Sequence, residues 1–508
     1  MPERTMPIRA LMVAIVCLPT TAYAERKPDY RVLVRAYADA MIEHGRDVYG
    51  EEHSPLFAAA LDRTTLRLGS RERFGSVPGV RSHDRSLSGA NPQNHVPLYA
   101  VLYELTELTG EKKYAREADK ALKFFFTHCQ SPETGLMAWG EHLYWDFHKE
   151  ACAGNDMHEI NGEWPFWDPC YRLAPEASWR FALGQWDHQI ACKRTGDFSR
   201  HARWSRHGPG SGFDFPRYAG QMIVNWADSH ARKENAGRGR REELITAISV
   251  VTGRMEANMK LAESGYLPAG RAEAGSHIDV VWLGSNLELA RCLWKAAPRV
   301  DDEHEELAAR MRRLALEQDA AFHKAPHEVA SGGGFAATLD ATTGKPRTRG
   351  SNRPYTAVWA TGYGHGMHAG TANRCHARYE QLATSHPEWA AKYRALILAT
   401  AQQYLSATPD TDELQKPGAL ANAIELMLHA YDMTGESKYL DRADYFGRVG
   451  VGLFLDDDLP LPKATNRHAH YEALTGGPGF MHALLRVATA GMRASGAAGT
   501  VGVQVLEV

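Results

Sequence analysis

The 508-residue sequence lacks any long hydrophobic run that could cross a membrane. The apolar segment at 10–18 is well short of the roughly 20 residues that a membrane-spanning helix needs. The chain also lacks an excess of one charge, since 58 Lys and Arg residues face 61 Asp and Glu residues. No basic stripe of the kind that binds nucleic acid is present. We therefore expect neither nucleic acid nor, for the mature protein, a membrane as a partner.

Cysteine is scarce, with seven in the whole chain, and no two have the CxxC spacing of a zinc site. Cys17 lies in the N-terminal apolar segment. The other six leave two alternatives open in an exported protein. One is a disulfide between Cys152 and either Cys170 or Cys192, and the other is a set of buried free thiols.

The N-terminal segment is typical of a secretory signal peptide. Arg4 and Arg9 precede the apolar run, and Ala22-Tyr23-Ala24 has the small-x-small pattern of a cleavage site. We predict a signal peptide over residues 1–24. The mature protein is then expected in the periplasm or outside the cell.

Long alternating strand patterns are also scarce, whereas helical periodicity dominates. Leu420, Ile424, Met427, Leu428 and Tyr431 lie on one helix face. Similar apolar faces occur over residues 31–45, 241–263, 278–296, 304–321 and 388–405. These patterns predict an all-α protein, with one catalytic domain over residues 25–508.

A weak internal repeat indicates how these helices are arranged. Residues 107–122, ELTGEKKYAREADKAL, resemble residues 432–447, DMTGESKYLDRADYFG. In each, a helix is expected to end at a Thr-Gly turn, because Gly adopts the left-handed C-cap conformation readily. Repeated helical hairpins predict a closed (α/α) toroid. Residues 194–204 could be a third copy, which would place Arg200 and His201 at a helix start.

Two segments interrupt the helical pattern and are predicted to be long rim loops with minor β structure. They are residues 130–175, rich in Trp, Gly, Pro, His and acids, and residues 324–354, with three consecutive glycines. Long loops in a compact domain are often functional. The tail at 493–508 is predicted to be a strand or disordered.

Four polar residues between positions 140 and 201 form the main candidate site. They are His142, Glu159 and the adjacent pair Arg200-His201. Two imidazoles and a carboxylate are suitable ligands for a divalent transition metal. The spacing alone does not require a metal, because His and Glu residues also stabilise polar loops. A toroid could bring the four together, since loops at one rim converge.

The sequence around this constellation resembles the family 2 polysaccharide lyases, the periplasmic pectate lyases. The segments that carry the resemblance are HEINGEWPFWDPCYRLAPEA, GQWDHQI and FSRHARW, within about 60 residues. The resemblance implies an (α/α)7 barrel, metal ligands at His142, Glu159 and His201, and a catalytic arginine at Arg200. His148 and His158 are alternatives to His142, because the loop before Glu159 looks shorter than the family pattern.

The resemblance also implies the reaction, β-elimination on a polyuronate such as polygalacturonate, which yields 4,5-unsaturated products. Arg200 is expected to act as the base at C5, with electrostatic binding of the substrate carboxylate as the alternative role. We expect manganese as the cofactor, with Co, Ni or Zn as alternatives, because nitrogen ligands disfavour Ca²⁺.

Aromatic and basic residues provide candidates for substrate binding. Eight of the twelve tryptophans fall between positions 139 and 226. The candidates for stacking on sugar rings or binding carboxylates are Trp145, Trp164, Trp167, Trp204, Arg217 and Tyr218. The expected partner is an anionic polysaccharide or oligosaccharide bound by a monomer.

Two other classes of function remain open from the sequence. The first is an (α/α)-barrel glycoside hydrolase, which needs two carboxyl groups across the scissile bond. Its candidate carboxylates are Glu159, Glu163, Asp168 and Asp187. The second is a sugar-binding protein without catalysis, which would not need the Arg-His pair.

Overall fold

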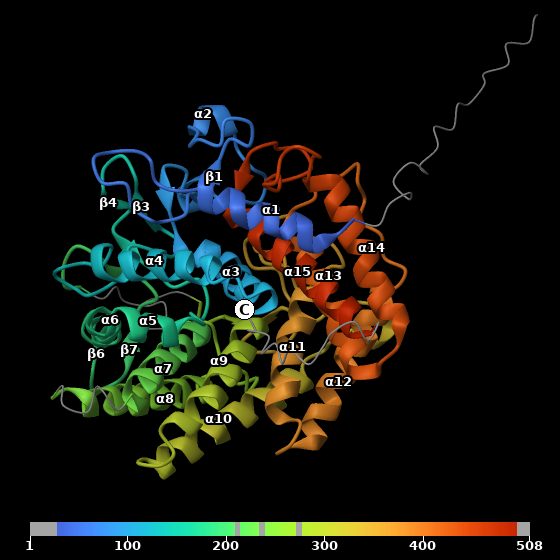
Figure 1. Ribbon diagram of the computed structural model, residues 1–508. Helices are drawn as coiled ribbons and strands as arrows, with labels where there is room; N and C mark the ends of the chain where they lie inside the picture. Colours follow the sequence, from blue (N-terminus) through green and yellow to red (C-terminus); the bar gives the residue numbers. More distant parts are fainter. Residues whose placement is uncertain (1–27, 209–213, 233–238, 271–276, 495–508) are drawn as a thin grey trace, which may run out of the picture.

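The computed structural model describes residues 28–208, 214–232, 239–270 and 277–494, and these are mostly helical (Figure 1). The predicted signal peptide lies outside the described residues. So does the tail from 495 onward, whereas residues 493 and 494 belong to the last helix, α15. Among the described helices, none is both long and apolar enough to cross a membrane.

An inner ring of seven helices can be traced through the described residues. From α7 to α15 each helix contacts the next, and α15 packs against α3. Tyr99 and Tyr103 of α3 pack against Phe166, directly before α5. The short helix α5 joins α7 through a 2.8 Å hydrogen bond from Trp167 Nε1 to Asn225 Oδ1. The inner helices are α3 (Val96–Thr109), α5 (Trp167–Leu173), α7 (Pro216–Ala231), α9 (Leu283–Ala296), α11 (His368–Leu382), α13 (Pro417–Thr434) and α15 (Gly477–Ala494).

A second set of helices covers this ring from outside. Each packs against an inner neighbour, and the first helix packs against the last inner one, so the colours of Figure 1 run around the molecule from blue to red. The outer helices are α1 (Tyr30–Glu43), α4 (Lys113–His128), α6 (Pro175–His188), α8 (Arg241–Met259), α10 (Glu305–Lys324), α12 (Pro387–Tyr404) and α14 (Ser437–Phe454). The short helix α2 (Arg71–Phe74) lies apart from both rings. The predicted (α/α)7 toroid is confirmed.

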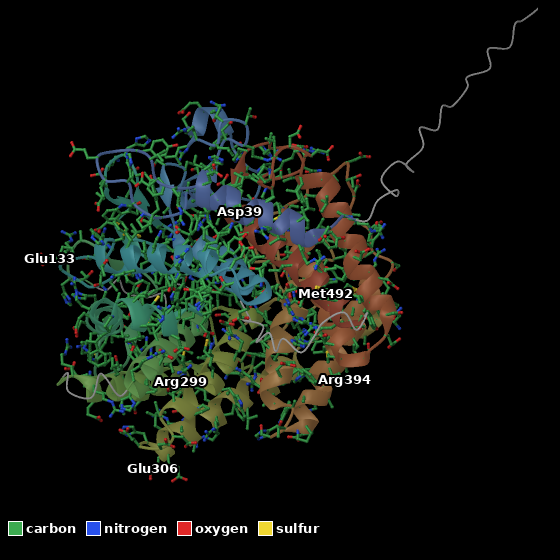
Figure 2. All side chains as sticks on the ribbon, in the orientation of Figure 1. Asp39, Glu133, Arg299, Glu306, Arg394 and Met492 are labelled. Atoms are coloured by element: carbon green, nitrogen blue, oxygen red, sulfur yellow. The ribbon has the colours of Figure 1, made fainter. Side chains whose placement is uncertain are left out.

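The apolar helix faces predicted from periodicity form the core between the rings. On α13, Leu420, Ile424 and Met427 have no exposed surface. Each such side chain contributes about 1.5–3 kcal/mol when it leaves water. Charged side chains such as Glu133, Glu306 and Arg394 lie at the periphery instead (Figure 2).

The inner helices all begin at one rim of the toroid, which we call the strand rim. The backbone N–H of Arg217, at the start of α7, donates to Ser285 Oγ at the start of α9. Gly418, at the start of α13, similarly touches Gly476, just before α15. Neighbouring inner helices are therefore parallel, and their ends form the opposite rim, the turn rim.

Short antiparallel sheets precede inner helices at the strand rim. β2 leads into α3, β5 into α5, β8 into α7, β9 into α9 and β11 into α15. The pairs are β1 (Ala60–Leu61) with β11 (Tyr471–Glu472), β2 (Gly89–Ala90) with β3 (Leu143–Asp146), β3 with β4 (Ala151–Gly154), β5 (Met157–His158) with β8 (Ala202–Arg203), β6 (Ile190–Cys192) with β7 (Asp197–Phe198), and β9 (Val280–Trp282) with β10 (Thr338–Asp340). The predicted loops at 130–175 and 324–354 contain several of these strands.

The two Thr-Gly repeats form tight connections at the turn rim, as predicted. Gly110 and Gly435 follow α3 and α13 with φ of 74° and 70°, the left-handed conformation of a helix C-cap. The third copy was wrong, because Thr195-Gly196 is the turn between β6 and β7. The left-handed conformation of Gly196 serves a hairpin as well as a helix end. Arg200 and His201 consequently lie between two strands and not at a helix start.

The six cysteines of the described residues are all free thiols. Of the two alternatives that the sequence left open, the structure therefore has no disulfide from Cys152 to Cys170 or Cys192. Four of the six are buried, whereas Cys152 and Cys192 are partly exposed.

Candidate active site

The four residues singled out in the sequence converge at the strand rim around the carboxylate of Glu159. His201 Nε2 lies 2.6 Å and His142 Nε2 lies 3.3 Å from the same oxygen, Glu159 Oε2. Arg200 Nη1 lies 2.5 Å from the other oxygen, Oε1, which also accepts a hydrogen bond from the Tyr218 hydroxyl. Residues that are up to 76 positions apart thus share one carboxylate.

Strand pairing places Glu159 beside His201. β5 pairs with β8 in antiparallel register, with His158 opposite Ala202. The next position along each strand therefore brings Glu159 opposite His201. This register arises from the β5–β8 pair and not from the helix start that the sequence predicted.

A glycine allows the His142 segment to approach Glu159. Gly140 forms a parallel bridge with Glu159 and has φ of 103°, which favours glycine. A Cβ atom at this position would lie 1.5 Å from the Glu159 carbonyl oxygen. Asn91 Nδ2 holds the same segment by donating to the carbonyls of Gly140 and Leu143, at 2.7 and 3.3 Å.

The surroundings of His142 suit a metal ligand. Its Nδ1 lies 3.5 Å from Asp84 Oδ1, whereas its Nε2 faces Glu159. Metal-binding histidines commonly have a carboxylate on the second ring nitrogen, which fixes the tautomer and the ring orientation. His142, Glu159 and His201 offer ligand atoms that all lie within 4.8 Å of one another.

The two alternative histidines lie outside this group. His158 is fully buried, and its Nε2 accepts a 3.1 Å hydrogen bond from Trp139 Nε1. His148 is exposed and packs its ring against Tyr49. Of the three candidates for the first ligand, His142 alone approaches Glu159 in the described contacts.

The electrostatics favour an ionised Glu159 despite its complete burial. Burial by itself would raise the pKa of this carboxyl. Hydrogen bonds from His142 and His201 and the charge of Arg200 outweigh burial and hold the pKa of Glu159 well below its usual range. The site therefore contains a buried negative charge facing two imidazoles, which is favourable for binding a cation.

Three further charged residues belong to the site, and the sequence prediction missed them. Glu141 Oε2 lies 3.3 Å from Arg200 Nη1, and the other Glu141 oxygen contacts the Arg81 guanidinium. Arg81 also binds Asp84, at 2.7 Å. Glu141 could have been found as the neighbour of His142, whereas no motif marks residues 81–84.

The predicted substrate residues have different surroundings. Tyr218 is buried against Glu159, and the Arg217 guanidinium stacks 5.0 Å from its ring. Burial would lower the pKa of Arg217, but Tyr218 and Glu159 raise it, so this guanidinium stays charged. Both residues are therefore part of the site.

The structure does not support sugar stacking for most of the proposed tryptophans. Trp164 is 2% exposed and packs against Trp139 and Phe126. Trp167 is 6% exposed and bonded to Asn225 of α7. Their ring faces are used by the core, and Trp145 is buried as well. Of the four, Trp204 alone is partly exposed.

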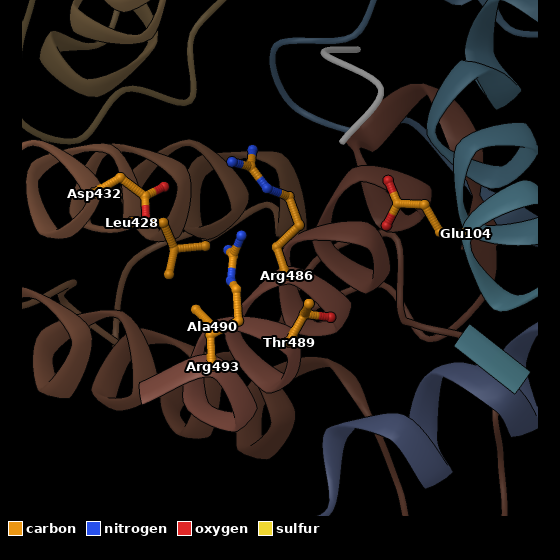
Figure 3. A pocket seen from close by; sticks show the side chains of 7 residues that line it. All are labelled: Glu104, Leu428, Asp432, Arg486, Thr489, Ala490 and Arg493. Carbon is orange, nitrogen blue, oxygen red and sulfur yellow. The ribbon is translucent and has the colours of Figure 1, made fainter. Parts of the chain in front are cut away.

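One pocket of the described residues lies away from this site. It lies at the turn rim, between α3, α13 and α15 (Figure 3). Its lining residues are Glu104, Leu428, Asp432, Arg486, Thr489, Ala490 and Arg493. The candidate site is defined by its side chains and not by this cavity.

Fold and site together define a helical toroid that carries a buried His-Glu-His group beside an arginine. The family model of periplasmic pectate lyases matches residues 74–227, a segment that contains all four residues. This match confirms the predicted resemblance. A pectate disaccharide-lyase of Dickeya dadantii (strain 3937) is 24% identical over 151 residues. The matched part covers 29% of this chain and 27% of that protein, so the chain spans about a quarter of its length.

Solved structures with a similar shape include three sugar-acting enzymes at low similarity. A D-mannose isomerase has a TM-score of 0.46 and 8% identity, covering 91% of this chain and 97% of its own. A glycoside hydrolase family 76 mannosidase from Bacteroides thetaiotaomicron VPI-5482 has a TM-score of 0.47 and 10% identity, covering 92% and 100%. An unsaturated glucuronyl hydrolase specific for heparin has a TM-score of 0.44 and 10% identity, covering 91% and 97%.

Proposed function

We propose that this protein is a metal-dependent polysaccharide lyase that cleaves polygalacturonate or a related polyuronate by β-elimination. The observation that carries the proposal is the convergence of His142 and His201 on one oxygen of the buried Glu159, with Arg200 on the other. The family match over residues 74–227 supports the reaction class. Export to the periplasm or the medium and a monomeric state belong to the same proposal.

The donor set fits a divalent transition metal. His142, Glu159 and His201 would hold the ion, with two imidazole nitrogens and one carboxylate as ligands. Mn²⁺ is our first choice, with Co²⁺, Ni²⁺ or Zn²⁺ as alternatives. A bound cation supplies Lewis-acid stabilisation of negative charge on the substrate carboxylate.

Arg200 is the proposed catalytic residue, acting as the base that accepts the C5 proton. Its contacts with Glu141 and Glu159 favour the charged guanidinium, which cannot accept a proton. A cation held by Glu159 would compete with Arg200 for that carboxylate and so weaken its hold on the charged form.

Arg217 and Tyr218 are proposed to orient the substrate. The Arg217 guanidinium lies next to Tyr218, whose hydroxyl contacts Glu159. A guanidinium can bind a uronate carboxylate with two parallel hydrogen bonds. Trp204 remains a proposed stacking surface.

The hydrolase alternative finds little support in the surroundings of its carboxylates. Glu163 contacts Arg291 and Lys295, Asp168 contacts Arg232, and Asp187 contacts Lys193 and Arg240. Each of these three is paired with basic side chains, whereas Glu159 is paired with Arg200 and also faces two imidazoles. An inverting or retaining pair needs two carboxyl groups across one sugar bond. We therefore favour elimination.

The experiment is an assay of polygalacturonate with Mn²⁺, before and after EDTA. We expect ultraviolet absorbance from the unsaturated product, loss of the signal with EDTA and recovery with excess Mn²⁺. New reducing ends without absorbance would indicate hydrolysis and overturn the proposal. Alginate and glucuronan, tested in parallel, identify the preferred polyuronate.

A further inference from the structure

A second group of potential ligands lies at the turn rim, far along α7 from the candidate active site. His230 is in the last turn of α7, Glu242 is in the first turn of α8, and Glu303 and His304 immediately precede α10. Their ligand atoms all lie within 4.8 Å of one another. Three separate helix ends thus contribute to one cluster.

The two histidines of this cluster point unpaired nitrogens at carboxylates. The His230 side chain is 1% exposed, and its Nε2 has no hydrogen-bond partner among the described residues. That nitrogen lies 4.0 Å from both Glu242 and Glu303. His304 Nε2 is likewise buried without a hydrogen bond in the described part, 3.8 Å from Glu242. The spacing is too long for hydrogen bonds and suits atoms that surround a cation.

The charges around the cluster also suit a cation. Arg241 binds both oxygens of Glu303, at 2.8 and 2.9 Å, and contacts Glu242 at 3.7 Å. It also lies 3.5 Å from His230 Nδ1. Glu242 is therefore held less closely by Arg241 than Glu303 is, so its carboxylate is the better placed to bind an ion. Two glutamates and one arginine also give the cluster a net negative charge.

We propose that His230, Glu242 and His304 form a second divalent-metal site, with Glu303 held beside it by Arg241. Two imidazoles and one carboxylate favour Zn²⁺, Ni²⁺ or Co²⁺ over Ca²⁺ or Mg²⁺. The ring centroids of His230 and His304 are 5.4 Å apart, so small side-chain rotations bring both nitrogens to one ion. A bound ion would join the α7–α8 and α9–α10 connections, which indicates a structural role.

This site is separate from the proposed lyase chemistry and can be tested without activity. The chain with His142→Ala and His201→Ala, which removes the first site, is titrated with Zn²⁺ by calorimetry. We expect one Zn²⁺ per chain and a higher Tm with Zn²⁺. Adding Glu242→Gln or His304→Ala should weaken binding at least tenfold and abolish the Tm shift. Glu305→Gln, an exposed neighbour in α10, is the matched control and should change neither.

Two results would overturn the proposal. One is no Zn²⁺ binding by the chain that lacks the first site, and the other is unchanged binding after His304→Ala. Both substituted side chains are partly exposed, at 70% for Glu242 and 26% for His304, so the variants should fold. If the His142→Ala and His201→Ala chain does not fold, zinc content is measured on the otherwise unchanged protein. His304→Ala should then lower it by one equivalent, and an unchanged content contradicts the site.

Discussion

The two rims of the toroid are built in different ways. At the turn rim, α3 and α4 are joined by the short turn at Gly110, and α13 and α14 by the one at Gly435. At the strand rim, more than thirty residues separate α4 from α5, and they hold His142 directly before β3 and Glu159 directly after β5. The turn rim is formed by short-range sequence signals such as a glycine at a helix end. The strand rim depends on contacts between segments far apart in the sequence. The proposed catalytic residues belong to the strand rim.

The largest expected difference between the rims is in activity. His201→Ala removes a proposed metal ligand, and elimination should fall by about 1000-fold or more. Lewis-acid stabilisation is worth several kcal/mol, and each ~1.4 kcal/mol is tenfold in rate. His386→Ala, in the α11–α12 connection, is the control and should keep full activity. Equal rates for the two variants in the ultraviolet assay would remove His201 from the mechanism.

Two glycines give a direct comparison of stability. Gly140→Ala places a Cβ against the Glu159 carbonyl and should cost about 3 kcal/mol of unfolding free energy, with loss of activity. Gly110→Ala, at the turn rim, has nothing within 4 Å of the new atom. It should cost only about 1 kcal/mol for the left-handed backbone. Urea denaturation measures the unfolding free energy of both variants. An equal loss in the two would show that Gly140 is not packed tightly against Glu159.

A smaller effect is expected from the carboxylate behind His142. Asp84→Asn leaves the ligands in place but weakens the partner of His142 Nδ1. Metal affinity should fall by about 10- to 100-fold, as for other carboxylates behind a ligating histidine. Asp432→Asn, in the turn-rim pocket, is the matched control. Calorimetric titration with Mn²⁺ measures both, and no change in Asp84→Asn would argue that Asp84 does not orient the ring.

The smallest effect is expected from reducing agents. Cys152 and Cys192 lie in strands at the strand rim, yet both are free thiols. Reductant should shift the Tm by less than about 1 °C, because no disulfide worth about 2–4 kcal/mol is lost. Thermal unfolding with and without reductant checks this. A clear fall in Tm would mean that a disulfide links segments of the strand rim.

The part of the structure that the sequence predicted is the part set by local periodicity. The α13 face at Leu420, Ile424 and Met427 and the Thr-Gly ends of α3 and α13 depend on neighbours within a few positions. The third Thr-Gly copy was wrong because the same left-handed glycine fits a hairpin. Thr195-Gly196 joins β6 to β7, and the Thr-Gly signal alone does not distinguish this hairpin turn from a helix end.

The candidate site also divides into residues that the sequence identified and residues that only the tertiary contacts identify. His142, Glu159, Arg200 and His201 could be identified because their residue types and motif are informative, and the structure brings them together. Arg81 and Asp84 could not, because their roles arise from contacts across the rim, whereas Glu141 could have been found as the neighbour of His142. The tryptophans were misjudged for a related reason. Composition shows that Trp164 and Trp167 are concentrated in one segment, but their burial depends on the packing of α4 and α6.

The central claim is that His142, Glu159 and His201 together hold a divalent metal. Crystals soaked in Mn²⁺, with diffraction data collected near the manganese absorption edge, test this claim directly. We predict an anomalous peak between Nε2 of His142, Nε2 of His201 and the Glu159 carboxylate. A map in which these three side chains keep their direct contacts, with no anomalous peak among them, would contradict the account.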